Sequence, residues 1–341
     1  MRHLVLASLT FLTTLASQAA PPRQASPREQ FTALLLDAGP WPERVEVRGK
    51  ILVVADFVAA AREQNVAAED LARTVADNLL LAVLTEELQH QKTWLSDADY
   101  EAAYAAYAKP YDETPFKVKV IATRFNAYPD LPSFQRRWRV MQSFVRAQKL
   151  EQPPLAELEL EAKLSLDFLT GALVQAEVWV HEAQLAADGR RDFAAAEGAA
   201  RQSLQQLAAG KEPEEREGVQ CLRPDNGRPI PRNQLRTALG EGEYHSLHHD
   251  LAADAVFAAE PGKLLGPVRT KTGVLVARVL RRPAGEGRVD VDDPRKQDLL
   301  RQMVEQRRFL AWVDQVLVST GIRIDGRPFA SPAPANAGKA K

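Results

Sequence analysis

Apolar residues recur every three or four positions along most of the N-terminal half, which predicts a series of amphipathic helices. The clearest is residues 68–92, where Leu71 and Leu79 share one face. Further helices are predicted over residues 28–37, 57–64, 133–150 and 155–173, and over a segment that carries Tyr100, Tyr104 and Tyr107. Asp56 and Ser96 are expected to cap two of these helices through their side-chain oxygens.

A period of two, typical of strands, replaces the helical period in shorter segments. In residues 44–48 charged and apolar side chains alternate, and Gly49 then turns the chain into a second apolar run over residues 51–54. Residues 116–121 could also form a strand within a proline-rich connection. In the C-terminal half, strands are predicted over residues 175–180, 264–269 and 274–280, helices over residues 194–209 and 294–318, and a short helix ending near Ala259.

The N-terminus combines a basic Arg2, an apolar run over residues 4–16 and the small residues Ser17 and Ala19. This order is typical of a secretory signal peptide, so residues 1–20 are predicted to be removed on export. The alternative is an uncleaved membrane anchor, but the apolar run is shorter than the roughly 20 residues that cross a bilayer. We therefore expect an exported, periplasmic protein with no stable membrane insertion after cleavage of the leader.

Composition narrows the classes of function. The 341 residues carry 44 basic and 45 acidic side chains, a balance that excludes the charge footprint of nucleic-acid binders. The single cysteine, Cys221, excludes a disulfide framework and a zinc–thiolate site, and we expect its thiol to be buried. His245, His248 and His249 lie close together, but they lack the HExxH spacing and a cysteine partner. We therefore expect no metal and no cofactor.

Residues 254–281 carry the most specific pattern in the chain. A short helix closes on Ala255-Val256-Phe257, and Pro261-Gly262, Leu265-Gly266-Pro267-Val268 and Gly273 follow in that order. In order and spacing, these residues resemble the end of a parvulin-type (PpiC-like) peptidyl-prolyl cis-trans isomerase domain. Upstream, the strand at residues 177–180, the helix over residues 194–209 and Gly210 are similar to the opening strand and first helix of that family.

The wider layout is similar to that of the SurA-type periplasmic chaperones. It has a leader, a helical domain over residues 27–173, a parvulin-like domain over residues 175–282, a final helix over residues 293–320 and a tail over residues 331–341 that we expect to be disordered. The resemblance implies that the final helix returns to the N-terminal helices, since an isolated helix of this length needs a partner. The implied fold is α+β. A mainly helical domain, completed by the C-terminal helix, would hold an inserted α/β domain with a small antiparallel sheet flanked by helices.

The catalytic pattern departs from that of the family that the chain resembles. The resemblance implies a site with two histidines, one in the opening strand and one in the final strand, together with a cysteine or aspartate and apolar walls. The two histidine positions hold Glu177 and Leu275 in this sequence, Cys221 falls near the third position, and Phe257 fits an apolar wall. His181, four residues beyond Glu177, is the alternative imidazole. With both family histidines replaced, we expect weak or absent isomerase activity.

Three functions agree with these features. The first is a folding helper that binds unfolded or extended client polypeptides between the two domains, which requires apolar surface and strand edges rather than catalytic groups. The second is an active prolyl isomerase with a non-standard site that uses His181 or one of the histidines at 245–249. The third is an envelope assembly subunit with one dedicated partner. Neither nucleic acid nor a membrane is among the expected partners.

Overall fold

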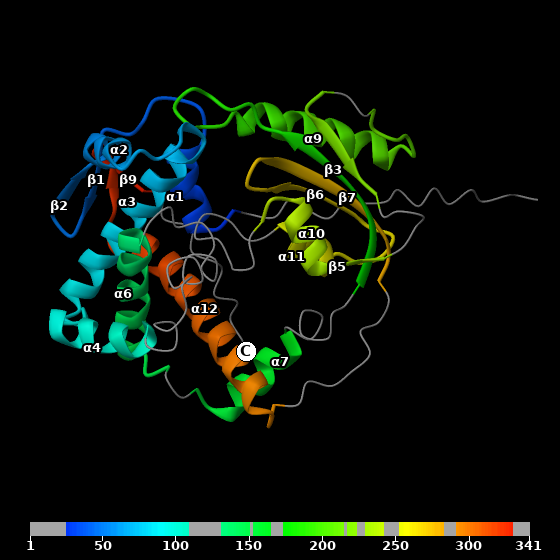
Figure 1. Ribbon diagram of the computed structural model, residues 1–341. Coiled ribbons are helices and arrows are strands. Elements are labelled where there is room, and N and C mark those ends of the chain that lie inside the picture. The colour runs from blue at the N-terminus through cyan, green and yellow to red at the C-terminus, as the bar shows by residue number, and fades with distance from the viewer. Residues whose placement is uncertain are drawn as a thin grey trace, which may run out of the picture.

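The computed structural model has an α+β fold with two antiparallel sheets, which confirms the predicted fold class at this level (Figure 1). It describes residues 25–108, 131–150, 153–164, 173–214, 217–223, 229–241, 252–282 and 291–329. Several predictions lie outside the described residues, namely the signal peptide (1–20), the strand over 116–121, the histidine cluster at 245–249 and the disordered tail (331–341).

A helical unit is formed by the described residues of 25–164 and 291–329. Its helices are α1 (Pro27–Leu36), α2 (Val54–Glu63), α3 (Ala68–His90), α4 (Asp97–Ala108), α6 (Leu131–Ala147), α7 (Leu155–Leu164) and α12 (Pro294–Ser319). Although α12 comes from the far end of the sequence, it packs against α1, α3, α6 and α7 (Figure 1). Phe309, Val313 and Leu317 of α12 share one buried core with Phe31 and Leu79.

An ion pair with a buried arginine links α12 to α1. The Arg28 side chain is 6% exposed, and its guanidinium lies 3.0 Å from a carboxylate oxygen of Asp314. The backbone N–H of Arg28 donates to the other oxygen of the same carboxylate at 2.9 Å. A buried charge without such a partner is strongly destabilising, so the position of α12 relative to α1 is narrowly defined.

Side-chain caps explain where two of the helices begin. Ser26 and Glu29 form a reciprocal capping box at the start of α1. The hydroxyl of Ser96 accepts the backbone N–H of Asp99 at 3.1 Å, which confirms the predicted cap of α4. The predicted cap at Asp56 is wrong because α2 begins before it. Asp56 lies in the first helical turn, where a carboxylate interacts favourably with the helix dipole.

A small sheet joins the two ends of the helical unit. It is formed by β1 (Arg44–Val47), β2 (Lys50–Val53), β8 (Arg323–Ile324) and β9 (Arg327–Pro328), in the order β2-β1-β8-β9. The Asp325 carboxylate accepts the backbone N–H groups of Glu43 and Arg44 at 2.8 and 3.0 Å. Sequence analysis predicted the first hairpin but missed β8 and β9, because such two-residue strands have no periodicity of their own.

The sheet unit comprises the described residues of 173–282. Its strands are β3 (Leu173–Glu182), β4 (Val219–Leu222), β5 (Ile230–Pro231), β6 (Leu264–Arg269) and β7 (Gly273–Arg281). The order is β4-β3-β7-β6, with β5 paired to the start of β3. The predicted helix over residues 155–173 is confirmed over Leu155–Leu164 and wrong at Leu173, which begins β3 and pairs with Pro231, while residues 165–172 lie outside the described residues. Long-range pairing outweighs local helix propensity at this position.

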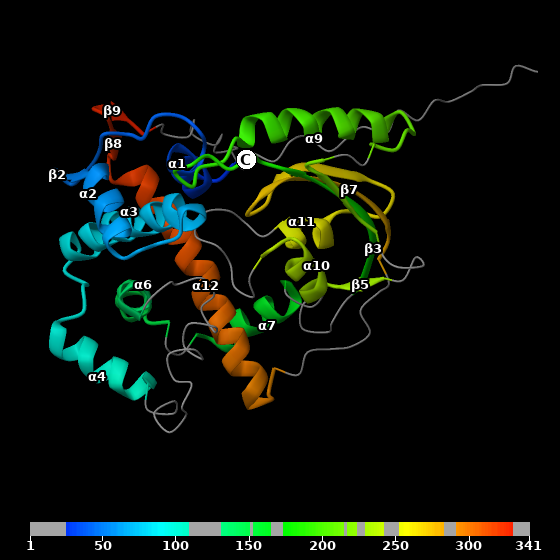
Figure 2. The same cartoon turned by 45° about the horizontal axis from the view of Figure 1, so that its top comes forward.

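Helices cover both faces of this sheet. Figure 2 shows α9 (Phe193–Ala208) along one face and α10 (Arg232–Ala238) and α11 (Ala252–Ala258) within the concave side of the other. Successive side chains of β3 point to opposite faces of the sheet, so they pack alternately against α9 and against α10 and α11. Val178 belongs to the core under α10 and α11, whereas Trp179 belongs to the core under α9.

A close contact between β3 and β7 requires a glycine at residue 273. A Cβ atom at this position would lie 2.1 Å from the carbonyl oxygen of His181, which belongs to the backbone and cannot rotate away. We predict that Gly273→Ala lowers the free energy of unfolding by about 2 kcal/mol or more, measured by urea denaturation. Gly198→Ala in α9, where a Cβ meets no atom within 4 Å, is the matched control and should stabilise the protein by about 0.5–1 kcal/mol. Equal stability of the two variants would contradict this account.

A buried carboxylate holds the start of α11. Glu241 accepts the backbone N–H groups of Ala252 and Ala253 at 2.6 and 3.1 Å. Burial raises the pKa of Glu241 to about 7, although the two N–H donors act in the opposite direction. Because the folded pKa is raised, the stability that this group contributes is complete below its unfolded pKa and is lost as the pH rises through about 7.

The variant Glu241→Gln tests this pH dependence. It retains a side-chain acceptor but cannot ionise. Between about pH 5 and about pH 8, the wild-type protein should lose up to about 3 kcal/mol more unfolding free energy than the variant, as measured by urea denaturation. Parallel pH profiles for the two proteins would show that the Glu241 carboxyl does not titrate in this range.

Candidate functional site

The structure places the two predicted catalytic positions on opposite faces of the sheet. Glu177 of β3 lies opposite Arg278 of β7, whereas Leu275 of β7 lies opposite Val180 of β3. Directly paired residues of neighbouring strands project to the same face. Glu177 therefore belongs to the face covered by α9, and Leu275 belongs to the core under α11, where it is fully buried.

Glu177 is part of an ionic cluster rather than of a pocket. Its carboxylate accepts the Nε–H of Arg278 at 2.8 Å, and Arg278 also lies 3.6 Å from Glu212. Arg223 continues the cluster. It pairs with Glu212 at 2.8 Å, and its Nε–H donates to the Sγ of Cys221 at 3.2 Å. The carboxylate of Glu177 is thus occupied by one cationic partner, Arg278.

Cys221 and His181 lie on the same face of the sheet as Glu177. Cys221 of β4 pairs with Trp179 of β3 and packs at the edge of the core under α9. Its side chain is half-buried, so the expectation of a buried thiol is wrong. His181 is 3% exposed and lies opposite Val274, four residues along β3 from Glu177.

Phe257 lies on the opposite face, together with Leu275. Its ring is 2% exposed in the core under α10 and α11, and the Arg232 guanidinium lies 5.6 Å from the ring centroid. Arg232 is itself paired with Asp254 at 2.8 Å. The sheet thus brings Glu177, Cys221 and His181 to one face and separates them from Leu275 and Phe257.

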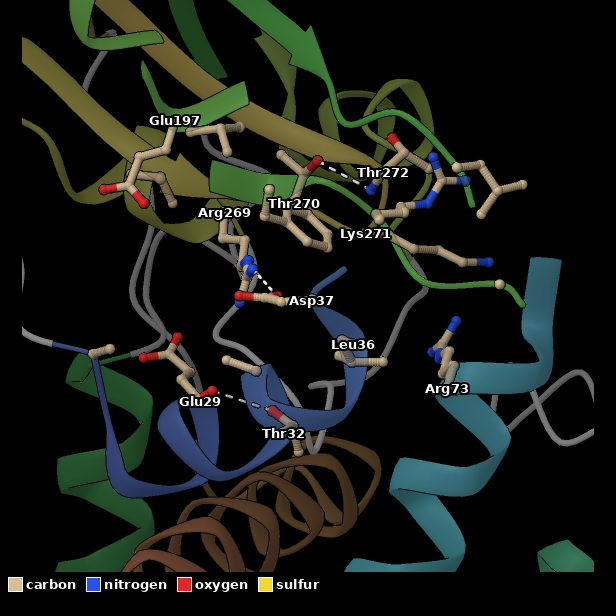
Figure 3. Close-up of a pocket in the computed structure, with 18 of the residues that line it drawn as sticks. Glu29, Thr32, Leu36, Asp37, Arg73, Glu197, Arg269, Thr270, Lys271 and Thr272 are labelled. Atoms are coloured by element: carbon tan, nitrogen blue, oxygen red, sulfur yellow. Dashed lines mark hydrogen bonds and ion pairs between the residues drawn. The ribbon is translucent and has the colours of Figure 1, made fainter. Parts of the chain in front are cut away.

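A large cavity lies instead between the two units, and we call it the interunit cleft. It has a volume of about 630 Å³ and is lined by α1, the start of α3, the loop of residues 185–193, the start of α9 and the β6–β7 turn (Figure 3). The sequence predicted client binding between the two domains but did not identify the residues that line this cleft, because its walls come from segments far apart in the sequence. One of them, the segment around Pro267 and Val268, belongs to the parvulin-like pattern, but that pattern did not indicate a wall of a cleft.

Backbone contacts hold the two walls of the cleft together. The Ala38 N–H donates to the carbonyl of Arg191 at 2.9 Å, and the Arg191 N–H donates to the carbonyl of Leu36 at 3.0 Å. Gly189, with φ +81°, lies so close to α3 that a Cβ would be 2.0 Å from the carbonyl oxygen of Ala68. The loop before α9 is therefore seated directly on the helical unit.

An ion pair crosses the middle of the cleft. The guanidinium of Arg269 pairs with Asp37 and lies 3.8 Å from the centroid of the Phe193 ring. Burial raises the pKa of Asp37, and the negative charge of Glu197 also raises it, while Arg269 lowers it. The pair links the end of α1 in the helical unit to β6 in the sheet unit.

The charges along the cleft are divided between its two ends. Figure 3 shows Glu29 and Glu197 on one side of the Asp37–Arg269 pair, and Lys271 and Arg73 on the other side. Partial burial lowers the pKa of Lys271, and the positive charges of Arg73 and Arg191 lower it further. Asp70 and Glu69 oppose this effect on Lys271. We call the first side the acidic end and the side of Arg73, Arg191 and Lys271 the basic end.

The cleft is suited to hold a short extended chain mainly through side chains. Leu36, Leu185 and Val268 supply apolar surface, and the Leu185 side chain is 45% exposed. β6 is the outermost strand on this side of the described sheet, but its Pro267 has no N–H to donate to an added strand. Strand addition alone is therefore a weak mode of binding here.

Two further features, a metal site and a membrane-spanning helix, were sought among the described residues. No group of three or more His, Cys, Asp or Glu side chains among them could hold a metal ion. Within the same stretches, every helix is too short or too polar to cross a membrane.

No model of a known protein family matches the chain, and no curated protein matches its sequence. Among solved structures, the fold is similar to a SurA-like chaperone of Campylobacter jejuni, at 7% identity over 83% of this chain and 99% of that chain, with a TM-score of 0.29. The peptidylprolyl isomerase PrsA of Bacillus cereus aligns at 11% identity over 79% and 88% of the two chains, with a TM-score of 0.24. The foldase PrsA of Streptococcus pneumoniae aligns at 11% identity over 80% and 91%, with a TM-score of 0.23. Because these scores are low, we base the function on the residues of this chain.

Proposed function

We propose that this protein is an exported folding helper that binds unfolded or extended polypeptides in the interunit cleft. Export, to a bacterial periplasm, is inferred from the leader pattern of residues 1–20. We further propose a division into a helical domain completed by α12 and an inserted parvulin-like domain. The parvulin-like domain is weak or inactive as an isomerase.

The observation that carries the proposal is the shape and lining of the cleft. Its volume of about 630 Å³ falls within the range of binding sites for small ligands and short peptide segments. Its wall alternates apolar side chains with charges of both signs, a lining that tolerates many sequences. A binder of varied clients needs such a surface more than it needs a narrow, specific pocket.

The family positions support binding rather than catalysis. Prolyl isomerisation has a barrier of roughly 18–20 kcal/mol, and lowering it requires polar groups placed around one bound prolyl peptide. Glu177 is held by Arg278 on one face of the sheet, and Leu275 is part of the core on the other. These two side chains cannot act on one substrate. No described observation favours the alternative of a single dedicated envelope partner.

Substitution within the cleft tests the binding site. Leu185→Glu places a charge on its exposed apolar wall, and we expect it to weaken binding of a reduced, unfolded client about fivefold or more. Leu34→Glu is the matched control, since Leu34 is 44% exposed, against 45% for Leu185, but lies outside the cleft. Suppression of client aggregation, measured by light scattering with several unrelated clients, should fall for the first variant only.

Two results would contradict this assignment. If both variants suppress aggregation as well as the wild type, the cleft is not the binding site. If the wild type acts on one client and on no other, a dedicated assembly partner becomes the better explanation.

A proline-peptide assay tests the isomerase alternative. The full chain should accelerate cis-trans isomerisation of a proline tetrapeptide only slightly above the uncatalysed rate, because no paired polar groups face one pocket at the family positions. His181→Ala should leave that rate unchanged. Acceleration at rates usual for parvulins, lost on His181→Ala, would identify an active enzyme with a non-standard site.

A further inference from the structure

We infer that the basic end of the interunit cleft binds a carboxylate of the client chain and thereby fixes the direction in which an extended segment lies. This inference rests on the proposed function and adds to it the chemical group that is recognised. It concerns Arg73 of α3, Arg191 of the loop before α9, and Lys271 of the β6–β7 turn.

The three cations come from different elements and converge on one side of the cleft. Figure 3 shows the side chains of Lys271 and Arg73 approaching one another across the opening between the sheet unit and α3. The charges of Arg73 and Arg191 both act on Lys271, so all three groups lie within electrostatic range. Like charges brought together in this way are unfavourable unless an anion joins them.

Within the described part of the chain, Lys271 and Arg73 have no carboxylate in direct contact. Among the residues that the structure describes, neither side chain forms an ion pair, and the buried Nε of Arg73 has no hydrogen-bond partner. Arg269, in the middle of the same cleft, is by contrast paired with Asp37. Two cations that line the basic end therefore have no directly bound carboxylate among the described residues.

The local charge count fits a single carboxylate. Glu69 and Asp70 also line the cleft here, and they offset two of the three positive charges of Arg73, Arg191 and Lys271. One positive charge remains, which one carboxylate would neutralise. A phosphate dianion or a strongly acidic segment would leave excess negative charge beside these two acids.

The opposite end disfavours a second carboxylate. Glu29 and Glu197 line it, and Asp37 is already paired with Arg269. Because like charges repel most strongly in a partly enclosed site, a segment with one negative group would bind in one direction only. That group could be the C-terminal carboxylate of the client or an Asp or Glu side chain, and the two sources share the same chemistry.

Three short peptides test the inference on the full chain. The first is fluorescein-labelled Ser-Val-Phe-Ser-Ala-Val-Phe-Ala with a free C-terminal carboxylate, the second is its C-terminal amide, and the third is the amide with one internal Ser replaced by Glu. Affinities are measured by fluorescence anisotropy at low and high salt. We expect the free carboxylate to bind about fivefold more tightly than the plain amide, with a preference that salt weakens.

Reversing the charge of Lys271 tests whether the basic end causes the preference for the free carboxylate. Lys271→Glu should abolish the difference between the first two peptides while leaving the plain amide bound. Lys263→Glu is the matched control, since Lys263 is also exposed near β6 but does not line the cleft. Thermal unfolding of both variants checks that the exposed substitutions leave the fold intact.

The possible results distinguish the carboxylate site from the folding-helper function. If the internal Glu restores tight binding, the site takes side-chain carboxylates, and if it does not, the site takes the C-terminus. Either result supports the inference, provided that Lys271→Glu abolishes the preference for the free carboxylate. Equal affinity of all three peptides would contradict the carboxylate site but would still agree with a folding helper that binds extended chains. If none of the peptides binds and no unfolded client is protected, both proposals fail.

Discussion

The return of α12 to the N-terminal helices is the constraint on which the rest of the structure depends. Phe309, Val313 and Leu317 are buried against residues that precede them by more than two hundred positions, and Arg28 and Asp314 place a charge pair within the same interface. Each side of that contact stabilises the other, since a long amphipathic helix needs an apolar partner and Arg28 needs a counter-charge. The intervening sheet unit is consequently tethered at both ends.

The interunit cleft follows from this tethering. The loop before α9 is seated on α1 and α3 by backbone hydrogen bonds and by the close approach of Gly189 to Ala68. Arg269 reaches across to Asp37 and ties the β6–β7 hairpin to the same helices. These contacts produce a cavity with one net positive charge at one end, from Arg73, Arg191 and Lys271 against Glu69 and Asp70. The proposed binding of an extended client in one direction depends on this distribution of charge.

In the sheet unit, the residues that carry the resemblance to parvulins serve packing. Phe257, Gly266 and Gly273 each serve the fold, through a buried ring, a positive φ at the irregularity in β6, and a close strand contact, respectively. Glu177 and Leu275 occupy the positions where the family pattern implies histidines, and they contribute an ion pair and a core residue. The resemblance therefore supports the architecture of this unit more strongly than its chemistry.

Much of the secondary structure was determined by the sequence alone. The apolar period of α3, the hydroxyl of Ser96 and the two strands β6 and β7 were all predictable, because helix periodicity, capping and strand alternation are local properties. Tertiary structure decided the rest. It made Leu173 a strand residue, paired β8 with β1, and placed Glu177 and Leu275 on opposite faces. It also brought Arg73, Arg191 and Lys271 together. These outcomes depend on contacts between segments that lie far apart in the sequence. The energy of such contacts cannot be read from a short stretch of residues, because it depends on which distant segments pack together.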